Sequence, residues 1–372
     1  MYKILTLVGT RPELIKLSLT IKKLDKNFKN ILVHSGQNYD YELNKIFFKE
    51  LKIRKPDFFL NVKDKMLSKT IANIIHETDK ILEKTKPDAI LVYGDTNTSL
   101  GLISAKRRKV PIFHMEAGNR CYDYRVPEEI NRKIADHISD VNFTISEQAK
   151  QNLICEGLDR SMIFKIGSNM KEVIDANQEK INTSKILKTL KLKSKNFIIV
   201  SLHREENVDN KIRLKKIIQK LKIVKTRLKK NIVFSTHPRT KKMIKEFKIP
   251  TNNILFLKPF GFFDYCCLQK NSYCTISDSG TIFEEASILN FPAITFRSSH
   301  ERHEGAEMGT VIITDFDDNN ITNTIKLSVD SRKNFSPHVD DYMNENVSQK
   351  VVNLIQSYIK IVNKKVWKKN EN

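Results

Sequence analysis

The sequence predicts an α/β protein made of two Rossmann-like, doubly wound domains. Short apolar runs alternate with longer amphipathic stretches along the chain, a pattern typical of parallel strands joined by crossover helices. The chain has 372 residues with 40% hydrophobic composition, which is enough for two separate cores. The alternation of apolar runs and helical stretches is interrupted once, by a polar stretch, so we place the hinge between the two domains near Gly167 to Ala176.

Twelve apolar runs are expected to be strands, six in each half of the chain. In the first half they are Lys3 to Val8, Ile31 to His34, Ala89 to Tyr93, Ile112 to Met115, Val141 to Thr144 and Ile163 to Ile166. In the second half they are Phe197 to Leu202, Ile232 to Ser235, Ile254 to Leu257, Tyr273 to Ile276, Ala293 to Phe296 and Val311 to Thr314. The expected domains are 1–168 and 169–346, followed by a terminal helix, 347–372, that could pack back across the seam.

The formal charge of +22 does not identify a partner. Nucleic acid, an acidic membrane surface and an anionic small substrate are all attracted by a positive field. Most lysines fall on predicted helix faces, so a solvated surface is the favoured interpretation, with no nucleic acid and no membrane as partner. No run is long enough to span a bilayer, and the apolar run at Ile4 to Val8 is too short for a signal peptide. We expect a cytoplasmic protein.

The sequence offers no convincing metal site or disulfide framework. Its five cysteines are odd in number and lack CxxC spacing, which fits a reducing compartment. His300 and His303 are too close in sequence to be persuasive as zinc ligands. We expect no metal.

Ligands of open parallel sheets bind beyond the carboxyl ends of the strands, so residues after each strand are the first candidates. The segment Gly9 to Lys16 ends the first strand and opens a helix with proline in its first turn. Its backbone N–H groups, Arg11 and Lys16 would face an anion such as pyrophosphate. The segment is not GxGxxG, so no NAD is expected, and the YxxxK spacing at Tyr41 is interpreted as accidental.

Three acidic sites follow strands or begin a helix in the first half. Asp95 and Glu116 each end a strand, and Glu128 lies in the first turn of a predicted helix. Each acid alone is more often a helix cap or a first-turn preference. Together they could converge on one cleft, where charge and burial adjust their pKa values for proton transfer.

The second half supplies cations and hydrogen-bond donors. His203 and His237 follow strands and could each lie where a phosphate binds, although a lone histidine is more often structural. The segment Ser277 to Thr281 opens a helix with small residues suited to a phosphate. Glu284 or Glu285, one turn inside this helix, could accept hydrogen bonds from ribose hydroxyls.

Seven motifs occur in a fixed order: GTRPE, GDT, MEAGNR, PEEINR, HREEN, THPR and SDSG…EEA. In this order the chain resembles the non-hydrolysing UDP-N-acetylglucosamine 2-epimerases from Gly9 to about Glu304. The resemblance implies a glycosyltransferase-B-like fold with the active site in the interdomain cleft, no cofactor and a homodimer. The implied catalytic residues are Asp95, Glu116, Glu128, Lys16 and His203. The implied UDP-sugar contacts are Arg11, His237, Ser279 and Gly280 at the diphosphate, Glu285 at the ribose, and Arg132.

Two segments depart from the commonest family pattern. GQNYDYELN, from Gln37, lacks the GQHxE-like sequence usual near the regulatory UDP-sugar site, and GNRCYDYRVPEEINRK replaces the more frequent GLR form. Both resemble the branch that makes UDP-N-acetyl-L-fucosamine from the 6-deoxy L-talo sugar nucleotide for capsule or O-antigen assembly. We therefore expect that substrate ahead of UDP-N-acetylglucosamine.

The implied reaction is inversion of carbon 2 through loss and recapture of UDP, because the carbon 2 proton is barely acidic without a departing group. Two enzymatic alternatives remain open, a UDP-sugar glycosyltransferase of the same fold and a hydrolysing 2-epimerase. A nucleic-acid-binding protein would explain the charge but none of the acids at the strand ends.

Overall fold

The computed structural model describes residues 1–37, 48–315 and 320–369, which form two compact units. Unit 1 comprises Met1–Ala176 with Asp341–Asn372, and unit 2 comprises Asn177–Asp340. Unit 1 thus extends beyond the expected boundary at residue 168. The reason is α7 (Asn169–Asp175), which is tied to unit 1 by a hydrogen bond from Asn169 Nδ2 to Thr20 Oγ1 (3.1 Å).

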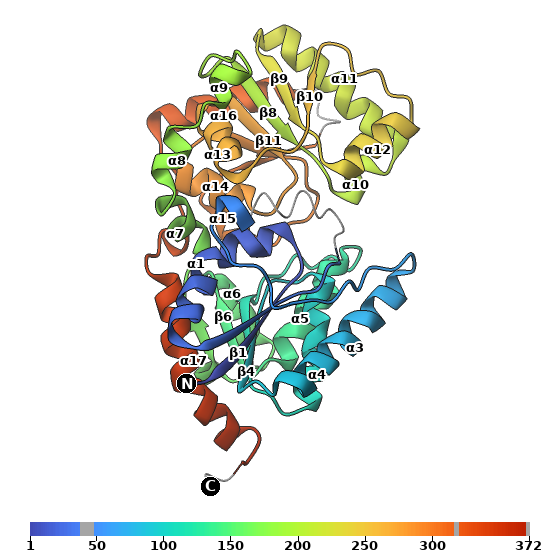
Figure 1. Cartoon of the computed structure of the whole chain (residues 1–372). Coiled ribbons are helices and arrows are strands. Elements are labelled where there is room, and N and C mark those ends of the chain that lie inside the picture. Colours follow the sequence, from blue (N-terminus) through green and yellow to red (C-terminus); the bar gives the residue numbers. More distant parts are fainter. Residues whose placement is uncertain (38–47, 316–319, 370–372) are drawn as a thin grey trace. The chain divides into compact units, whose positions relative to one another are not determined.

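Unit 1 is built on a parallel sheet in the order β3-β2-β1-β4-β5-β6-β7 (Figure 1). Its strands are β1 (Lys3–Val8), β2 (Lys29–His34), β3 (Phe58–Phe59), β4 (Ala89–Tyr93), β5 (Ile112–Ala117), β6 (Val141–Thr144) and β7 (Ile163–Lys165). Its longer helices are α1 (Arg11–Asn27), α3 (Leu67–Thr85), α4 (Leu102–Arg107), α5 (Pro127–Ile138), α6 (Glu147–Cys155) and α17 (Val347–Lys365), with α7 given above. All five residues of β4 are buried, as expected for an interior strand of a parallel sheet with helices on both faces.

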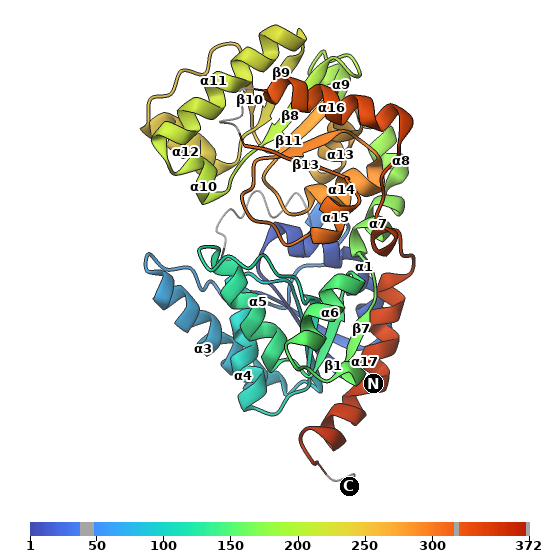
Figure 2. The ribbon, with the colours of Figure 1, turned by 180° about the vertical axis from the view of Figure 1, so that it is seen from behind.

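Unit 2 repeats this architecture with the strand order β10-β9-β8-β11-β12-β13 (Figure 2). Its strands are β8 (Phe197–Ser201), β9 (Asn231–Ser235), β10 (Leu255–Leu257), β11 (Cys274–Ser277), β12 (Ala293–Thr295) and β13 (Ile312–Ile313). Its helices are α8 (Gln178–Asn182), α9 (Ile186–Thr189), α10 (Glu205–Val208), α11 (Lys211–Leu228), α12 (Pro238–Glu246), α13 (Phe262–Asn271), α14 (Ile282–Leu289), α15 (His303–Glu307) and α16 (Ile321–Asn334). All twelve predicted strands are confirmed, and the two-residue β3 was missed.

The C-terminal helix α17 belongs to unit 1 and packs against α1 and α7. The Ser348 hydroxyl donates to Glu172 Oε2 (2.7 Å) and lies 3.3 Å from Thr20 Oγ1, so three helices meet at one buried polar point. Among the described residues, no helix is both long and apolar enough to cross a membrane.

Candidate active site

The strand order of unit 1 places three predicted site residues next to one another. Strands β1, β4 and β5 are consecutive in the sheet. Arg11 begins α1 just after β1, Asp95 follows β4, and Glu116 is the next-to-last residue of β5. The carboxyl ends of parallel strands share one edge of the sheet, so these residues gather at the edge where ligands of open α/β sheets bind.

Lys16 and Glu116 form an ion pair at this edge. Lys16 Nζ lies 3.3 Å from Glu116 Oε1 and 5.4 Å from the centre of the Tyr93 ring. The lysine side chain is buried, with only 3% exposed, whereas the Glu116 side chain is 14% exposed. A cation enclosed in this way holds one carboxylate in place while leaving that carboxylate reachable from solvent.

An irregularity of the β5 backbone sets the direction of the Glu116 side chain. The register of β5 against β6 shifts between Met115 and Ala117, and Glu116 has the left-handed φ of 67°. The facing residue of the neighbouring loop is Gly94, and a Cβ built there would lie 3.6 Å from Glu116 Oε2. Bulges of this kind redirect a side chain beside active sites.

Asp95 is held by Arg132, which reaches it from α5. Arg132 Nε and Nη2 both donate to Asp95 Oδ2, at 3.0 and 2.6 Å, and Nη1 donates to Glu129 Oε2 at 2.9 Å. Asn131 Nδ2 adds a bond to the Asp95 carbonyl (3.0 Å). Arg132 is buried and engaged by two carboxylates, a geometry that favours a positioning role. Its predicted role as a substrate contact stays a prediction.

The two glutamates at the start of α5 have different environments. Glu129 is fully buried and accepts hydrogen bonds from the N–H groups of Cys121 (3.0 Å) and Tyr122 (3.1 Å), so it organises the preceding loop. Glu128 is only partly buried. It lies four residues before Arg132, hence on the same face of the helix. Of the two, Glu128 fits the predicted catalytic role.

Glu13 is a site residue that the sequence analysis did not single out. Its carboxylate accepts hydrogen bonds from the Gly9 N–H (2.6 Å) and from the hydroxyls of Thr10 (2.9 Å) and Thr96 (2.8 Å). Burial raises its pKa to about 7, although these hydrogen bonds lower it in part. Glu13 thus takes the Gly9 N–H in this structure, and the expected contact of the Gly9 to Lys16 segment with an anion such as pyrophosphate stays a prediction. The sequence signal was T-x-x-E at residues 10–13, a capping-box pattern.

In unit 2, His203 is clamped by a buried aspartate that the sequence analysis also left aside. Asp278 Oδ1 lies 3.1 Å from His203 Nδ1, and the carboxylate also accepts from the N–H groups of His203 and Arg204. Burial alone would raise the pKa of Asp278, but the charge and hydrogen bonds of His203, with Asn207, lower it to about 2. The His203 ring is thereby fixed through one nitrogen while 37% of its side chain stays exposed.

The remaining predicted diphosphate contacts follow neighbouring strands. His237 is exposed, caps α12 by accepting the Arg239 N–H on Nδ1 (3.2 Å), and has its ring centre 5.5 Å from that of His203. The Ser279 N–H donates to Ser277 Oγ (3.1 Å). At Gly280 an added Cβ would lie only 2.2 Å from Glu301 Oε1, so the Glu301 carboxylate would have to move. These residues follow β8, β9 and β11, which are consecutive in the sheet.

Glu285 is buried on α14 and accepts a hydrogen bond from Gln269 Nε2 (2.5 Å). The neighbouring Glu284 is fully buried and pairs with Arg302 (3.1 Å), so it is a structural residue. This contrast favours Glu285 over Glu284 as the predicted ribose acceptor.

The profile of the UDP-N-acetylglucosamine 2-epimerase family matches residues 22–356. The chain belongs to this family. It is similar to the UDP-N-acetylglucosamine 2-epimerase of Rickettsia bellii, with 48% identity and a TM-score of 0.92 over 99% of this chain and 100% of that one. The Methanocaldococcus jannaschii enzyme in complex with UDP-GlcNAc and UDP has 34% identity and a TM-score of 0.89, over 95% and 99% of the two chains. UDP-2,3-diacetamido-2,3-dideoxy-D-glucuronate 2-epimerase of Pseudomonas aeruginosa is 32% identical over 317 residues, 84% of this chain and 88% of that one.

The comparisons confirm the family and the enzyme class inferred from the motifs. The protein is an isomerase of the UDP-N-acetylglucosamine 2-epimerase type, and the glycosyltransferase-B-like fold with two parallel-sheet units is confirmed as well. Among the described residues, no three His, Cys, Asp or Glu side chains group in a way that could hold a metal ion.

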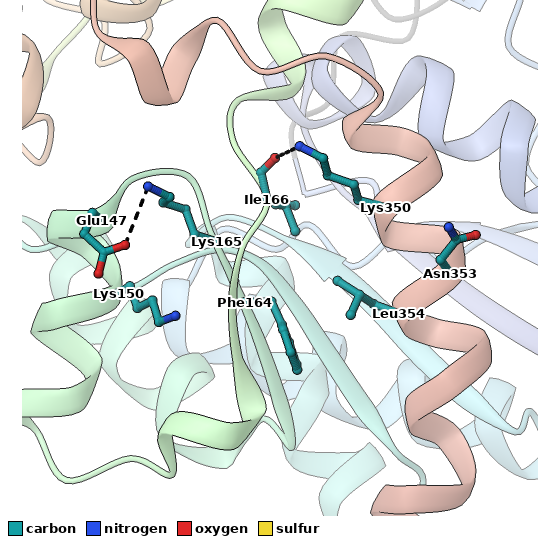
Figure 3. Close-up of a pocket in the computed structure, with 8 residues that line it drawn as sticks. All are labelled: Glu147, Lys150, Phe164, Lys165, Ile166, Lys350, Asn353 and Leu354. Carbon is teal, nitrogen blue, oxygen red and sulfur yellow. Dashed lines mark hydrogen bonds and ion pairs between the residues drawn. The ribbon is translucent and has the colours of Figure 1, made fainter.

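A pocket in unit 1 of the epimerase lies away from these residues. It has a volume of about 470 Å³ and is lined in unit 1 by Phe164 and Ile166 of the β7 segment, by Lys350 and Leu354 of α17, and by residues of α6 (Figure 3). None of the predicted catalytic or UDP-sugar residues lines it.

One of the two segments that depart from the commonest family pattern can be traced in the structure. Asn119, which stands in the GNR form, donates from Nδ2 to the Glu116 carbonyl (3.2 Å). Arg120 is fully buried and pairs with Asp136 (2.6 Å) and Glu156 (2.6 Å). The other segment, GQNYDYELN, has its residues 38–44, with Tyr41, outside the described residues.

Proposed function

We propose that this epimerase inverts carbon 2 of a UDP-linked 2-acetamido sugar by eliminating and re-adding UDP. One observation carries the proposal. Asp95 follows β4 and Glu116 lies near the end of the adjacent β5, and each carboxylate pairs with its own buried cation, Arg132 and Lys16 respectively. Paired carboxylates held at one sheet edge can move a proton off one face of a sugar carbon and onto the other.

The proposed reaction begins with cleavage of the bond between carbon 1 and the diphosphate oxygen. The electron pair leaves with UDP, carbon 1 gains oxocarbenium character, and a carboxylate removes the proton of carbon 2 to give a glycal. A proton then returns to the opposite face of carbon 2, and the UDP oxygen attacks carbon 1 again. Anionic groups beside the cation-like sugar and cationic groups beside the departing diphosphate both lower the barrier.

The residues divide between these two tasks. We assign proton transfer to carboxylates of unit 1, oriented by Lys16 and Arg132, and nucleotide binding to unit 2 together with Arg11 of unit 1. The proposed acid and base come from Asp95, Glu116 and Glu128. The proposed diphosphate contacts are Arg11, His203, His237, Ser279 and Gly280, and the ribose acceptor is Glu285.

Two sugars are candidates for the substrate. The named relatives from Rickettsia and Methanocaldococcus support interconversion of UDP-N-acetylglucosamine and UDP-N-acetylmannosamine. The GNRCYDYRVPEE segment supports the 6-deoxy L-talo nucleotide and its product UDP-N-acetyl-L-fucosamine, because it resembles the corresponding segment of that branch of the family. Either product would serve surface polysaccharide assembly, capsule or O-antigen, and we propose a cytoplasmic homodimer on the family resemblance.

The decisive experiment is incubation with each UDP-sugar in deuterated water, followed by NMR. The proposal predicts deuterium at carbon 2 of the accepted sugar without loss of UDP. Asp95→Asn and Glu128→Gln should lower that exchange by about 10² to 10⁴-fold, the usual worth of a general acid or base. UDP affinity, measured by calorimetry, should change little, and Glu77→Gln on the surface of α3 is the matched control.

Other outcomes point to other functions. Unaltered exchange in both variants would remove these assignments. Stoichiometric release of UDP would identify a hydrolysing epimerase. Reaction only when an acceptor is added would identify a glycosyltransferase.

A further inference from the structure

The helix α11 carries an unusual charge distribution. Residues 211–230 hold ten Lys or Arg and no Asp or Glu, whereas the whole chain has 65 Lys and Arg against 43 Asp and Glu. The segment therefore accounts for nearly half of the net charge of +22. The cations of a merely solvated helix are usually interspersed with acids that pair with them along the helix.

The packing of α11 leaves five of these ten cations exposed. Its apolar side chains Leu214, Ile217, Ile218, Leu221 and Val224 are buried against the sheet of unit 2. Lys211, Lys215, Lys216, Arg227 and Lys229 are exposed on the remaining surface. We call these five residues, with Ile212 and Ile223, the α11 basic face.

The two isoleucines distinguish this face from a purely hydrated one. Ile212 is 69% exposed and Ile223 is 43% exposed. They are eleven residues apart, about three helical turns, so both point outward from the same line of the helix. By the same helical geometry, Lys215 lies on one side of that line and Lys216 and Arg227 lie on the other.

The neighbouring helix α12 extends the positive surface. Figures 1 and 2 show α12 beside α11, and Lys222 Nζ of α11 donates to the Pro250 carbonyl just beyond α12 (3.1 Å). Lys241, Lys242, Lys245 and Lys248 are exposed there.

The α11 basic face leads away from the carboxyl edge of the sheet. Helix α11 follows β8 and precedes β9, so it runs from the carboxyl ends of the strands back toward their amino ends. A partner bound along it would leave the edge with His203 and Ser279 open.

We propose that the α11 basic face docks the enzyme onto an anionic lipid bilayer surface. Lysines bordering a short line of exposed aliphatic side chains match a membrane interface, where the cations meet acidic headgroups and the isoleucines enter the apolar boundary. A nucleic-acid backbone would use the cations but would gain nothing from Ile212 and Ile223. Charge alone favoured a solvated surface with no membrane partner, and the outward isoleucines are what change that interpretation.

The test is cosedimentation of the full-length protein with vesicles of phosphatidylcholine alone or mixed with phosphatidylglycerol. Binding is expected only to the mixed vesicles and should be lost at high salt, because exposed charges are screened. Each cation near the surface contributes about a fivefold factor, so Lys211→Gln with Lys215→Gln and Arg227→Gln should weaken binding roughly 100-fold. Ile212→Ser with Ile223→Ser should weaken binding by roughly tenfold.

A matched control removes the same charge from another exposed part of unit 2. Lys185→Gln with Lys188→Gln and Lys193→Gln, around α9, should leave vesicle binding near the wild-type level. All variants should keep the wild-type Tm and UDP-sugar turnover, which separates this proposal from the proposed function. Equal losses in the α11 and α9 variants, no vesicle binding, or binding that double-stranded DNA outcompetes at equal phosphate concentration would each overturn the proposal.

Discussion

Replacement of Arg132 by methionine separates a positioning role from a substrate-binding one. In the structure the guanidinium makes two bonds to Asp95 and one to Glu129, and only 3% of its side chain is exposed. Methionine fills much of the space but removes the charge. It leaves Glu129 as a buried carboxylate without its cation and Asp95 without its clamp.

The expected loss of stability follows from Glu129. Removing one partner of a buried ion pair costs about 3 to 5 kcal/mol. Glu129 keeps hydrogen bonds from the N–H groups of Cys121 and Tyr122, so we expect the lower end, about 3 kcal/mol. For a unit of this size that corresponds to a Tm about 6 to 12 °C lower.

The catalytic effect is read separately, by steady-state kinetics with the UDP-sugar at a temperature where the variant is folded. An unclamped Asp95 should lower kcat by about 10²-fold, with KM nearly unchanged. Arg132→Lys should recover much of the Tm but little of kcat, because an ammonium lacks the rigid fork that meets Asp95 and Glu129 together. Lys133→Met, the next residue on α5, is the control and should change little, since Lys133 bonds only the Tyr124 hydroxyl in the described contacts. A raised KM with kcat intact would refute the positioning argument and make Arg132 a substrate contact.

Three further perturbations test other parts of the site. Gly280→Ala would place a Cβ 2.2 Å from Glu301 Oε1, so UDP affinity in calorimetry should fall by about tenfold or more while the Tm changes little. The pKa of Asp278 is lowered to about 2, so its ionised form adds roughly 2 kcal/mol to the free energy of unfolding above pH 4. This contribution is lost as pH falls toward 2. The Asp278→Asn variant should therefore show a flatter dependence of stability on pH over that range. The pKa of Glu13 is raised from 4.5 to about 7, so the free energy of unfolding should decline by up to roughly 3 kcal/mol as pH rises between those values. The Glu13→Gln variant should lack this decline, and a variant that still shows it would contradict the assignment to Glu13.

The fold was largely predictable because interior parallel strands are buried on both faces and read as continuous apolar runs. Strand β4, the sequence AILVY, is the clearest case. The exception, β3, has two residues at the sheet edge, and its Phe59 is 39% exposed, so only the short apolar run from Phe58 to Leu60 marks it. Unit 1 also takes in more chain than expected at both boundaries, because α7 and α17 are fixed by side-chain contacts with α1 that no local pattern encodes.

The site was predictable where position along a strand decides it and not where a distant partner does. Asp95 and Glu116 could be found because they end strands. The role of Arg132 could not, because the carboxylate it clamps lies 37 residues earlier in the sequence. Asp278 was visible in the SDSG motif, but its contact with the His203 ring depends on β8 and β11 being neighbours in the sheet.

Glu116 shows how the surrounding structure sustains a functional conformation. A left-handed backbone at a residue with a Cβ costs about 1 to 2 kcal/mol, and a regular strand would avoid that cost while pointing the side chain elsewhere. The conformation is held from both sides: the Gly94 N–H donates to the Met115 carbonyl (2.9 Å), and Asn119 Nδ2 donates to the carbonyl of Glu116 itself. Gly94 in turn is fixed by His114, whose Nε2 lies 2.9 Å from the Gly94 carbonyl. Because Gly94 directly precedes Asp95, the contacts that hold Glu116 in its strained position also set the loop of the second carboxylate. The two acids therefore share these contacts, and we expect a substitution at Gly94 or His114 to disturb the positions of both.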